Sequence, residues 1–248
     1  MRAELKPGSE LRAVVFGAGG AIGGALVDTL ANDSRIAEVH ACARGHLDAQ
    51  MPKVATHECD ITQAGELAAT ADAIGAGGAV DLVIVATGVL HRKEDIFPEK
   101  TLAEIDAGRM AEVLRVNTVG PALVARYFLP LLRKKRRNVF AALSARVGSI
   151  SDNRLGGWVS YRASKAALNM VLKTLSIEQA RRNPESIVVG LHPGTVDSAL
   201  SAPFQSNVPE GKLFAPAYAA GRLLQVIDGL GPGDTGSVFA WDGSRIEP

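Results

Sequence analysis

Short apolar runs alternate along the chain with amphipathic segments of helical periodicity. The apolar runs, which are typical of buried strands, are Ala13–Phe16, Val39–Cys42, Val54–His57, Leu82–Ala86, Val139–Leu143, Ile187–Leu191 and Val238–Trp241. The segments predicted as helices include Ile22–Leu30, Met110–Leu132, Tyr161–Ala180 and Pro216–Leu230. Strands that alternate with helices predict a parallel sheet covered on both faces. We therefore expect a single-domain α/β fold over residues 1–248, with a doubly wound, mostly parallel seven-stranded sheet.

Composition agrees with a folded, soluble domain. Hydrophobic residues make up 47% of the chain and charged residues 21%, which argues against intrinsic disorder. The formal net charge of +1 is too small to indicate nucleic acid or an acidic membrane as the main partner. Cys42 and Cys59, the only cysteines, lie in short apolar segments, so we expect buried thiols rather than a disulfide or a zinc site.

Targeting, membrane and metal signals are weak. Met1–Arg12 is polar, and the chain has no apolar run long enough for a membrane span, so we expect a cytoplasmic protein, with a soluble eukaryotic organelle left open. The basic run Arg133–Arg137 is interpreted as a solvated helix end, with nucleic-acid binding as the alternative. No metal site is predicted, because the histidines lack ligand spacing; they are His40, His46, His57, His91 and His192.

A glycine-rich turn links the first predicted strand to the first predicted helix. Gly17, Gly20 and Gly23 are spaced GxxGxxG, and Ile22 stands where the GxGxxG pattern has its last glycine. Glycines permit a tight turn and close approach of the backbone to a pyrophosphate, while the helix start offers unpaired N–H groups. The turn therefore predicts a dinucleotide site, and a tight connection without a ligand is the alternative.

Tyr161 and Lys165 lie four residues apart at the start of a predicted helix and so share one face. A cation near a phenol favours phenolate and lowers the tyrosine pKa, which would make Tyr161 a usable proton donor and acceptor. A surface pair is the alternative interpretation.

Two polar residues extend this candidate site. Ser144 ends the predicted strand Val139–Leu143, at the carboxyl edge where doubly wound sheets bind ligands, and can polarise a substrate oxygen. Asn117 lies within a predicted helix, where asparagine is a poor former, and this suggests helix distortion and a bound water. A turn serine and a solvent-facing amide are the alternatives.

Together and in this order, the motifs resemble the short-chain dehydrogenase/reductase family from about Leu11 to Gly243, closest to its carbonyl-reductase and C-factor-like branch. The glycine turn is similar to TGxxxGxG, with Phe16 in place of threonine and Ala21 in place of the middle glycine. Ala86-Thr87-Gly88 stands where the family has Asn-Ala-Gly. The resemblance implies a Rossmann fold that binds a nicotinamide dinucleotide.

The resemblance also implies roles for particular residues. Asp60 is similar to the acidic residue that contacts adenine, and Pro193–Val196 to the loop at the nicotinamide. The implied cofactor-binding residues are Gly17, Gly19, Gly20, Ala21, Ile22, Gly23, Arg44, Asp60, Ile61, Ala86, Thr87, Gly88, Tyr161, Lys165, Pro193, Gly194, Thr195 and Val196.

Asn117, Ser144, Tyr161 and Lys165 fall on the family's four catalytic positions. The resemblance implies that hydride moves between nicotinamide and the substrate carbon while Tyr161 transfers a proton to or from the substrate oxygen. Ser144 would hold that oxygen, Lys165 would lower the tyrosine pKa and contact the ribose, and Asn117 would anchor a water.

The end of the second predicted strand favours NADP(H) over NAD(H). It reads Cys42-Ala43-Arg44, so the carboxylate that binds the ribose hydroxyls of NAD is missing and a guanidinium follows. Arg44 can bind a 2′-phosphate through charge-assisted hydrogen bonds. A surface arginine is the alternative, since Gly20 leaves the glycine turn without a second basic residue.

Residues 197–214 are predicted to form a substrate lid, with Phe204 and Phe214 on its apolar underside; an ordinary surface loop is the alternative. The substrate would be small to medium-sized and apolar around its carbonyl. Val238–Trp241 is predicted to be a sheet edge buried in a homodimer or homotetramer, with concealment inside the monomer as the alternative.

These observations predict an NADP(H)-dependent oxidoreductase acting on a carbonyl and its secondary alcohol, with Tyr161 as general acid/base. The alternative is a non-enzymatic dinucleotide sensor on the same fold, which would have no chemical need for a lysine beside the tyrosine.

Overall fold

The computed structural model describes residues 10–48, 51–92 and 95–248, so most of the polar amino-terminal stretch Met1–Arg12 lies outside the described residues. The strands of the main sheet, in spatial order, are β10 (Arg245–Ile246), β9 (Val238–Ala240), β6 (Ser186–His192), β5 (Asn138–Leu143), β4 (Leu82–Val85), β1 (Leu11–Phe16), β2 (Ile36–Ala43) and β3 (Val54–Glu58). All neighbours are parallel except β10 and β9. The α/β fold and the predicted strands are confirmed.

The sheet has eight strands rather than seven. The additional strand, β10, pairs antiparallel with β9 and places Arg245 opposite Phe239. It is two residues long, too short to give a periodic hydrophobic signal. The prediction that Val238–Trp241 forms an edge is therefore wrong, because β6 and β10 flank β9 on its two sides. The strand is concealed within the monomer.

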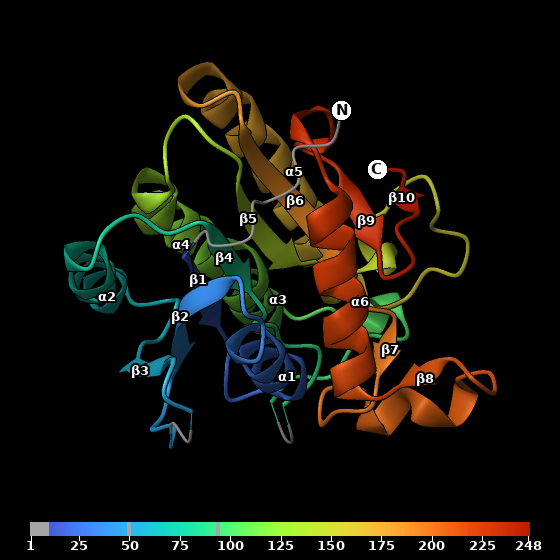
Figure 1. Ribbon diagram of the computed structural model, residues 1–248. Helices are drawn as coiled ribbons and strands as arrows, with labels where there is room; N and C mark the ends of the chain where they lie inside the picture. The colour runs from blue at the N-terminus through green and yellow to red at the C-terminus, as the bar shows by residue number, and fades with distance from the viewer. Residues whose placement is uncertain (1–9, 49–50, 93–94) are drawn as a thin grey trace.

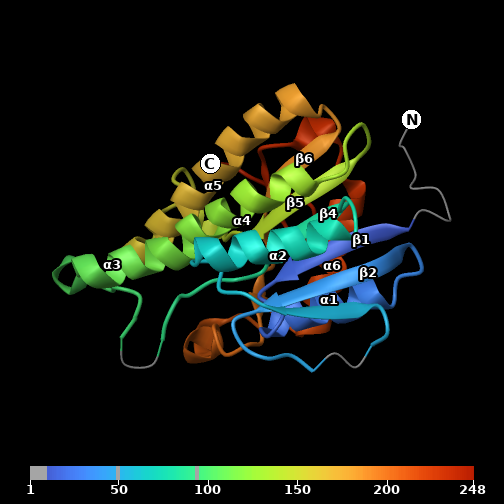
Figure 2. The same cartoon turned by 90° about the vertical axis from the view of Figure 1, so that its left-hand side faces the viewer.

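Helices cover both faces of the sheet (Figures 1 and 2). On one face lie α1 (Ala21–Ala31) and α6 (Pro216–Gly229), which form a core with one side of the strands. On the other face lie α2 (Ala64–Ala76), α4 (Gly120–Phe128) and α5 (Val159–Arg182). Strand β1 has neighbours on both sides, and the chain winds outward from it in opposite directions. This reversal leaves a crevice at the carboxyl ends of the strands.

The long predicted helix Met110–Leu132 is divided. It consists of α3 (Ala107–Leu114), a π-helical turn at Arg115–Val119, α4 and a short 3-10 turn at Leu129–Leu131. In the π-helical turn the Gly120 N–H donates to the Arg115 carbonyl, five residues earlier. Pro121 explains the change, because proline has no N–H for the carbonyl of Asn117, its partner in a regular α-helix. The predicted helix distortion at Asn117 is therefore present.

The basic run Arg133–Arg137 does not end a helix. It lies in the loop before β5, and Lys134, Lys135 and Arg136 are exposed. Arg133 pairs with the buried carboxylate of Asp81 at 2.7 Å, while Arg137 donates to the carbonyls of Ile227 and Leu230 at the end of α6. The interpretation as a solvated helix end is corrected: two of these cations bind buried acceptors, one of them a carboxylate and the other the negative end of a different helix.

Cys42 and Cys59 are both buried free thiols. Within residues 10–48, 51–92 and 95–248, no cluster of three histidine, cysteine or acidic side chains is arranged to bind a metal ion. None of the helices in these ranges is long and apolar enough to cross a membrane.

Candidate active site

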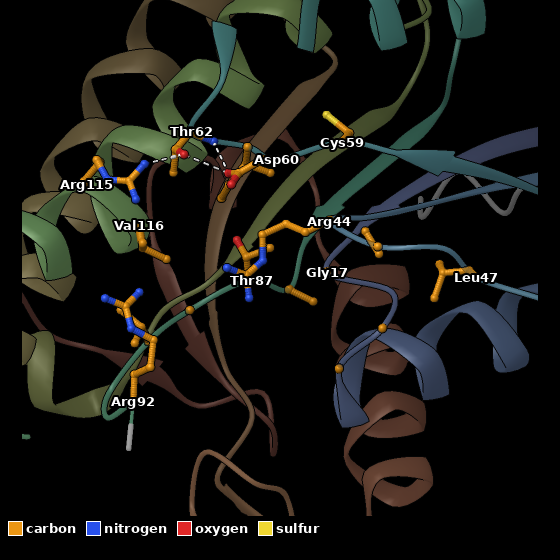
Figure 3. Close-up of a pocket in the computed structure, with 18 of the residues that line it drawn as sticks. Gly17, Arg44, Leu47, Cys59, Asp60, Thr62, Thr87, Arg92, Arg115 and Val116 are labelled. Atoms are coloured by element: carbon orange, nitrogen blue, oxygen red, sulfur yellow. Dashed lines mark hydrogen bonds between the residues drawn. The ribbon is translucent and has the colours of Figure 1, made fainter. Parts of the chain in front are cut away.

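A cleft of about 610 Å³ lies at the carboxyl ends of β1 to β4 (Figure 3). The cofactor-binding residues predicted from the sequence that line it are Gly17, Gly19, Gly20, Arg44, Asp60, Ile61, Ala86, Thr87 and Gly88. The lining residues that the sequence did not indicate are Ala43, Gly45, His46, Leu47, Cys59, Thr62, Val89, His91, Arg92, Glu112, Arg115 and Val116. Four of these follow a strand or a predicted site residue directly, so strand order would have suggested them; they are Gly45, Cys59, Thr62 and Val89.

The glycine turn is shaped by close backbone contacts. Gly17 adopts φ +85°, and a Cβ there would lie 2.9 Å from the carbonyl carbon of Ala86. Gly23 does not line the cleft, but a side chain on it would overlap the Gly17 carbonyl, so this glycine lets α1 start directly behind the turn. The N–H groups of Gly17 and Ala18 both donate to the carbonyl of Cys42, which fixes the turn against β2.

Several N–H groups of this turn are available for a ligand. Gly20 caps α1 without a side-chain hydrogen bond. Among the described residues, no main-chain carbonyl accepts a hydrogen bond from the N–H of Gly19, Ala21, Ile22 or Gly23. Unpaired N–H groups at a helix start, next to a cleft, fit the pyrophosphate of a dinucleotide.

The outer end of the cleft carries charge. Asp60 accepts hydrogen bonds from the Thr62 main chain and hydroxyl, both at 2.8 Å, and Arg115 donates to the same hydroxyl. Glu112 pairs with Arg115 at 2.7 Å and with Arg92 at 3.1 Å. Arg44 is exposed at the end of β2 and extends into the cleft (Figure 3), and no ion pair joins it to a described acidic side chain.

Asn117 is fully buried rather than solvent-facing. Its Oδ1 accepts from the Val89 N–H at 2.8 Å, and its Nδ2 donates to the Val89 carbonyl at 2.8 Å and to Ser164 Oγ at 3.0 Å. Both amide protons are thus used within the protein. The side chain ties the loop after β4 to α5, and the π-helical turn is what directs it there.

Ser144 is buried at the end of β5. Its hydroxyl donates to Asn169 Oδ1 at 2.6 Å, and its N–H donates to the Leu191 carbonyl on β6. Asn169 was not predicted, although it lies one helical turn beyond Lys165 and so on the same face of α5.

Lys165 is buried, with 3% of its surface exposed, so the surface-pair interpretation is wrong. Its Nζ donates to the Leu143 carbonyl at 2.7 Å and lies 5.8 Å from the centre of the Tyr161 ring. A Cβ on Gly88, at the cleft wall, would lie 3.7 Å from this Nζ and 3.5 Å from Asn117 Oδ1. Lys165 on α5 and Asn117 in the π-helical turn therefore meet the cleft at Gly88.

The pKa values of Tyr161 and Lys165 differ from those expected for a tyrosine activated by a nearby lysine. Burial raises the pKa of Tyr161 to about 12, and burial lowers the pKa of Lys165 to about 8. The expected lowering of the tyrosine pKa by Lys165 is absent, because removal of the phenol from water raises this pKa. The Lys165 ammonium itself donates to a main-chain carbonyl. Tyr161 is thus a protonated acid at neutral pH.

The predicted nicotinamide loop and lid form a small structured unit. Pro193 and Gly194 precede β7 (Thr195–Val196), which pairs with β8 (Leu213–Phe214) around a short helix at Ala202–Asn207. Phe214 packs on the Trp241 ring at 4.6 Å, and a Cβ on Gly194, which has φ +77°, would contact its ring. Residues 197–214 are therefore anchored at both ends.

Phe204 lies apart from Phe214. Its ring packs on Trp158 at 5.0 Å and on His91 at 5.7 Å, and Trp158 in turn meets the edge of Tyr161 at 6.4 Å. Sequence reasoning missed Trp158 and His91. Trp158 stands three residues before Tyr161, and a rare aromatic residue so close to a predicted catalytic tyrosine was a usable signal.

Comparisons with known proteins agree with this arrangement. The family model of short chain dehydrogenases matches residues 12–209. The C-signal protein of Myxococcus xanthus is 36% identical over 146 residues, which are 58% of this chain and 82% of that protein. The 1-hydroxy-2-glutathionyl-2-methyl-3-butene dehydrogenase of Rhodococcus sp. (strain AD45) is 30% identical over 189 residues, 76% of this chain and 77% of that protein.

A solved structure has the same fold. The NADPH-bound carbonyl reductase from chicken fatty liver superposes with a TM-score of 0.83 at 24% identity, covering 97% of this chain and all of that one. Its likeness extends over both the cleft and the segment after β6. The chain therefore belongs to the short chain dehydrogenase family, and its activity is of the oxidoreductase kind.

Proposed function

We propose that the protein is an NADP(H)-dependent oxidoreductase that interconverts a carbonyl compound and its secondary alcohol. The observation that carries this proposal is the meeting point at Gly88, where the dinucleotide-shaped cleft adjoins Lys165 Nζ and the Asn117 side chain. A cleft that only bound a dinucleotide would have no need of a buried ammonium beside a tyrosine at its inner end.

The residues present fit the dinucleotide. The unpaired N–H groups of Gly19, Ala21, Ile22 and Gly23 would hold the pyrophosphate. Arg44 would hold the 2′-phosphate, and Asp60 and Ile61 the adenine. Pro193–Val196, Tyr161 and Lys165 would hold the nicotinamide half. When bound, the nicotinamide supplies or accepts the hydride.

Tyr161 would act as the general acid/base. Because its pKa is raised to about 12, the hydroxyl is protonated at neutral pH and ready to donate to the oxygen of a carbonyl being reduced. Lys165, with a pKa of about 8, still carries its proton at neutral pH and would stabilise the phenolate left behind. Ser144 would turn its hydroxyl from Asn169 to the substrate oxygen.

The substrate is proposed to be small to medium-sized and apolar around its carbonyl. Support comes from the aromatic contact of Trp158 with both Tyr161 and Phe204, which lines one side of the tyrosine with apolar surface. Among the described aromatic contacts, no lysine or arginine lies over the rings of Trp158 or Phe204, and Lys165, which lies 5.8 Å from the centre of the Tyr161 ring, donates to the Leu143 carbonyl. Carboxylate or phosphate substrates would lack a clamp there.

A homodimer or homotetramer, a single domain over residues 1–248 and a cytoplasmic location are retained as predictions. Because β10 covers β9, support for assembly comes instead from α5, where Met170 and Ile177 are 66% and 48% exposed and lie seven residues apart on one helix face. Light scattering of the purified protein at micromolar concentration tests assembly, and the mass of one chain would contradict it.

The activity is tested by following NADPH and NADH absorbance with a panel of ketones, aldehydes, quinones and secondary alcohols. We expect carbonyl-dependent oxidation of NADPH, faster than that of NADH. Tight dinucleotide binding without turnover of any member of the panel would overturn the proposal in favour of a sensor. Turnover with NADH alone would overturn the cofactor assignment and leave the reaction class intact.

A further inference from the structure

Glu99 is a buried carboxylate outside the cleft, with 4% of its surface exposed. Its carboxylate accepts a hydrogen bond from the Ser160 N–H at 3.1 Å and another from the Ser160 hydroxyl. Its main-chain carbonyl accepts from the Trp158 N–H. No lysine, arginine or histidine of the described residues forms an ion pair with it. The Glu99 side chain thus lies at the positive amino end of α5, hydrogen-bonded to its first turn.

The backbone that Glu99 holds has an unusual conformation. Gly156, Gly157 and Trp158 have φ values of 65°, 67° and 53°, three successive residues in the left-handed region. The two glycines adopt it freely, whereas a tryptophan there is strained, because its Cβ crowds the main chain. Such a conformation persists only where surrounding contacts enforce it. The bonds from Glu99 to Trp158 and Ser160 are the contacts on either side of the point where the chain enters α5.

Trp158 and Ser160 both lie next to Tyr161, the proposed acid. Ser160 directly precedes Tyr161, and the ring of Trp158 meets the edge of the Tyr161 ring at 6.4 Å while packing on Phe204 at 5.0 Å. Any rotation of the first turn of α5 would move the tyrosine and its aromatic neighbour together. Glu99 is itself anchored, because the adjacent Pro98 and Ile96 are buried.

We propose that Glu99 is a positioning residue: by holding Trp158 and Ser160 it sets the direction of Tyr161 and the place of the aromatic surface against which substrate binds. This role rests on the proposed function of Tyr161. This positioning role differs from that of an ordinary helix cap, because loss of a cap would lower stability without altering the geometry of the tyrosine. It also predicts a specific effect on turnover, because small misplacements of a proton donor cost rate more than binding.

The test uses the full chain carrying Trp241→Phe, which leaves Trp158 as the sole tryptophan of the two in the sequence. In this background Glu99→Gln keeps one acceptor oxygen for the two Ser160 donors and replaces the other with an amide group, at nearly constant size. We expect kcat for a carbonyl substrate to fall about tenfold, the KM for NADPH to stay within about twofold, and Trp158 emission and anisotropy to change. Ser160→Ala should reproduce part of the loss, and the double variant should be no worse than Glu99→Gln, because both remove the same bond.

Glu104→Gln is the matched control. Glu104 is an exposed carboxylate five residues further on that caps its own short helix by accepting from the Lys100 and Thr101 N–H groups, away from α5. It should change neither kcat nor the fluorescence of Trp158. An equal loss of kcat in this control would overturn the positioning role.

Two further outcomes would also overturn it: unchanged kcat in folded Glu99→Gln, or unchanged Trp158 fluorescence. The fluorescence measurement stands without turnover, so a wild type that proves inactive would refute the proposed function and still leave the positioning of Trp158 tested. Should Glu99→Gln fail to fold, Ser160→Ala carries the same comparison, because it leaves the Glu99 carbonyl bond to Trp158 in place.

Discussion

The two ends of the candidate site present different kinds of polar group. Around the glycine turn the available groups are main-chain N–H groups, and the charged side chains that face the cleft, such as Arg44, are exposed. Around Tyr161 the polar groups are side chains, and Asn117, Ser144 and Lys165 are buried with their polar atoms bonded to protein. The nucleotide end therefore depends on the path of the backbone, and the tyrosine end depends on particular side-chain atoms.

The difference explains which departures from the family pattern matter. Phe16, Ala21 and Thr87 replace family residues at the nucleotide end, yet the turn still offers its N–H groups and Gly17 still fits against Ala86. Backbone binding tolerates such changes because no side-chain atom is used. At the tyrosine end, where the side chains of Asn117, Ser144 and Lys165 are all hydrogen-bonded, we expect single substitutions to reduce turnover directly.

The strongest test of this contrast is Tyr161→Phe, which removes one oxygen and keeps the ring. We expect kcat to fall about 10²- to 10⁴-fold while the Kd for NADPH and the melting temperature barely change. Steady-state kinetics and a binding titration check this. Tyr127→Phe, on α4 and outside the cleft, is the control and should be fully active. A loss of tenfold or less in Tyr161→Phe would assign proton transfer elsewhere.

At the nucleotide end the largest effect is expected for Arg44→Ala. Loss of charge-assisted bonds to a 2′-phosphate should lower kcat/KM for NADPH about 10- to 100-fold and leave that for NADH unchanged. The exposed Arg154, outside the cleft, supplies the control Arg154→Ala. If wild type and Arg44→Ala show the same preference between the two cofactors, the assignment of Arg44 fails.

Gly17→Ala tests whether the nucleotide end depends on backbone path. The added methyl group would face the Ala86 carbonyl carbon at 2.9 Å in a residue with φ +85°. We expect the free energy of unfolding to fall by about 1–3 kcal/mol and NADPH binding to weaken. Gly45→Ala, also on the cleft but with open space at its Cβ, should change both little. Similar losses in the two variants would mean that the cleft, rather than the turn, is sensitive.

The pH dependence of stability tests the buried Lys165 at the tyrosine end. Its pKa is lowered from its ordinary value of 10.5 to about 8, so between these values the folded protein holds fewer protons than the unfolded chain, and stability rises with pH there. Below about pH 8 the buried charge persists as a cost. Lys165→Met should therefore raise the melting temperature at pH 7 by a few degrees, abolish turnover and remove the rise above pH 8. Thermal unfolding from pH 7 to 10 measures this; a variant less stable than wild type at pH 7 contradicts it.

The smallest effects are expected in residues 197–214. Phe204→Ala should raise the KM for apolar carbonyls about threefold to tenfold and spare NADPH affinity, because Phe204 supports Trp158. Phe214→Ala should alter substrate preference through the Gly194 loop, on which it packs. Both follow from kinetics across the substrate panel. Unchanged kinetics in the two variants would remove this segment from the site.

Periodicity and turn chemistry were enough to predict the parallel strands and the glycine turn, since both are local properties of the chain. The spacing of Tyr161 and Lys165 also predicted one helix face correctly. The π-helical turn was foreseeable from Pro121, four residues after Asn117, because that proline removes the α-helical partner. Each of these features depends only on residues that lie close together in the sequence.

What the sequence could not reveal depends on distant partners. Glu99 meets Ser160 across 61 residues, and Arg137 finds its acceptors on α6 some 90 residues later. The tyrosine pKa was mispredicted for a similar reason: it is raised by burial, which tertiary packing determines. The carbonyl that accepts a hydrogen bond from Lys165 belongs to Leu143, 22 residues earlier. No periodic pattern encodes such pairs, because tertiary packing creates them.

The π-helical turn at Arg115–Val119 makes chain length, as well as residue identity, a constraint on this part of the molecule. It holds one residue more than the same turn of α-helix would, and each residue of an α-helix corresponds to about 100° of rotation. A one-residue deletion there would remove the extra residue and rotate Asn117 relative to Val89 and α5, its present hydrogen-bond partners. Insertions and deletions should therefore be tolerated poorly between Arg115 and Val119, and well in the exposed loop at Lys134–Arg136.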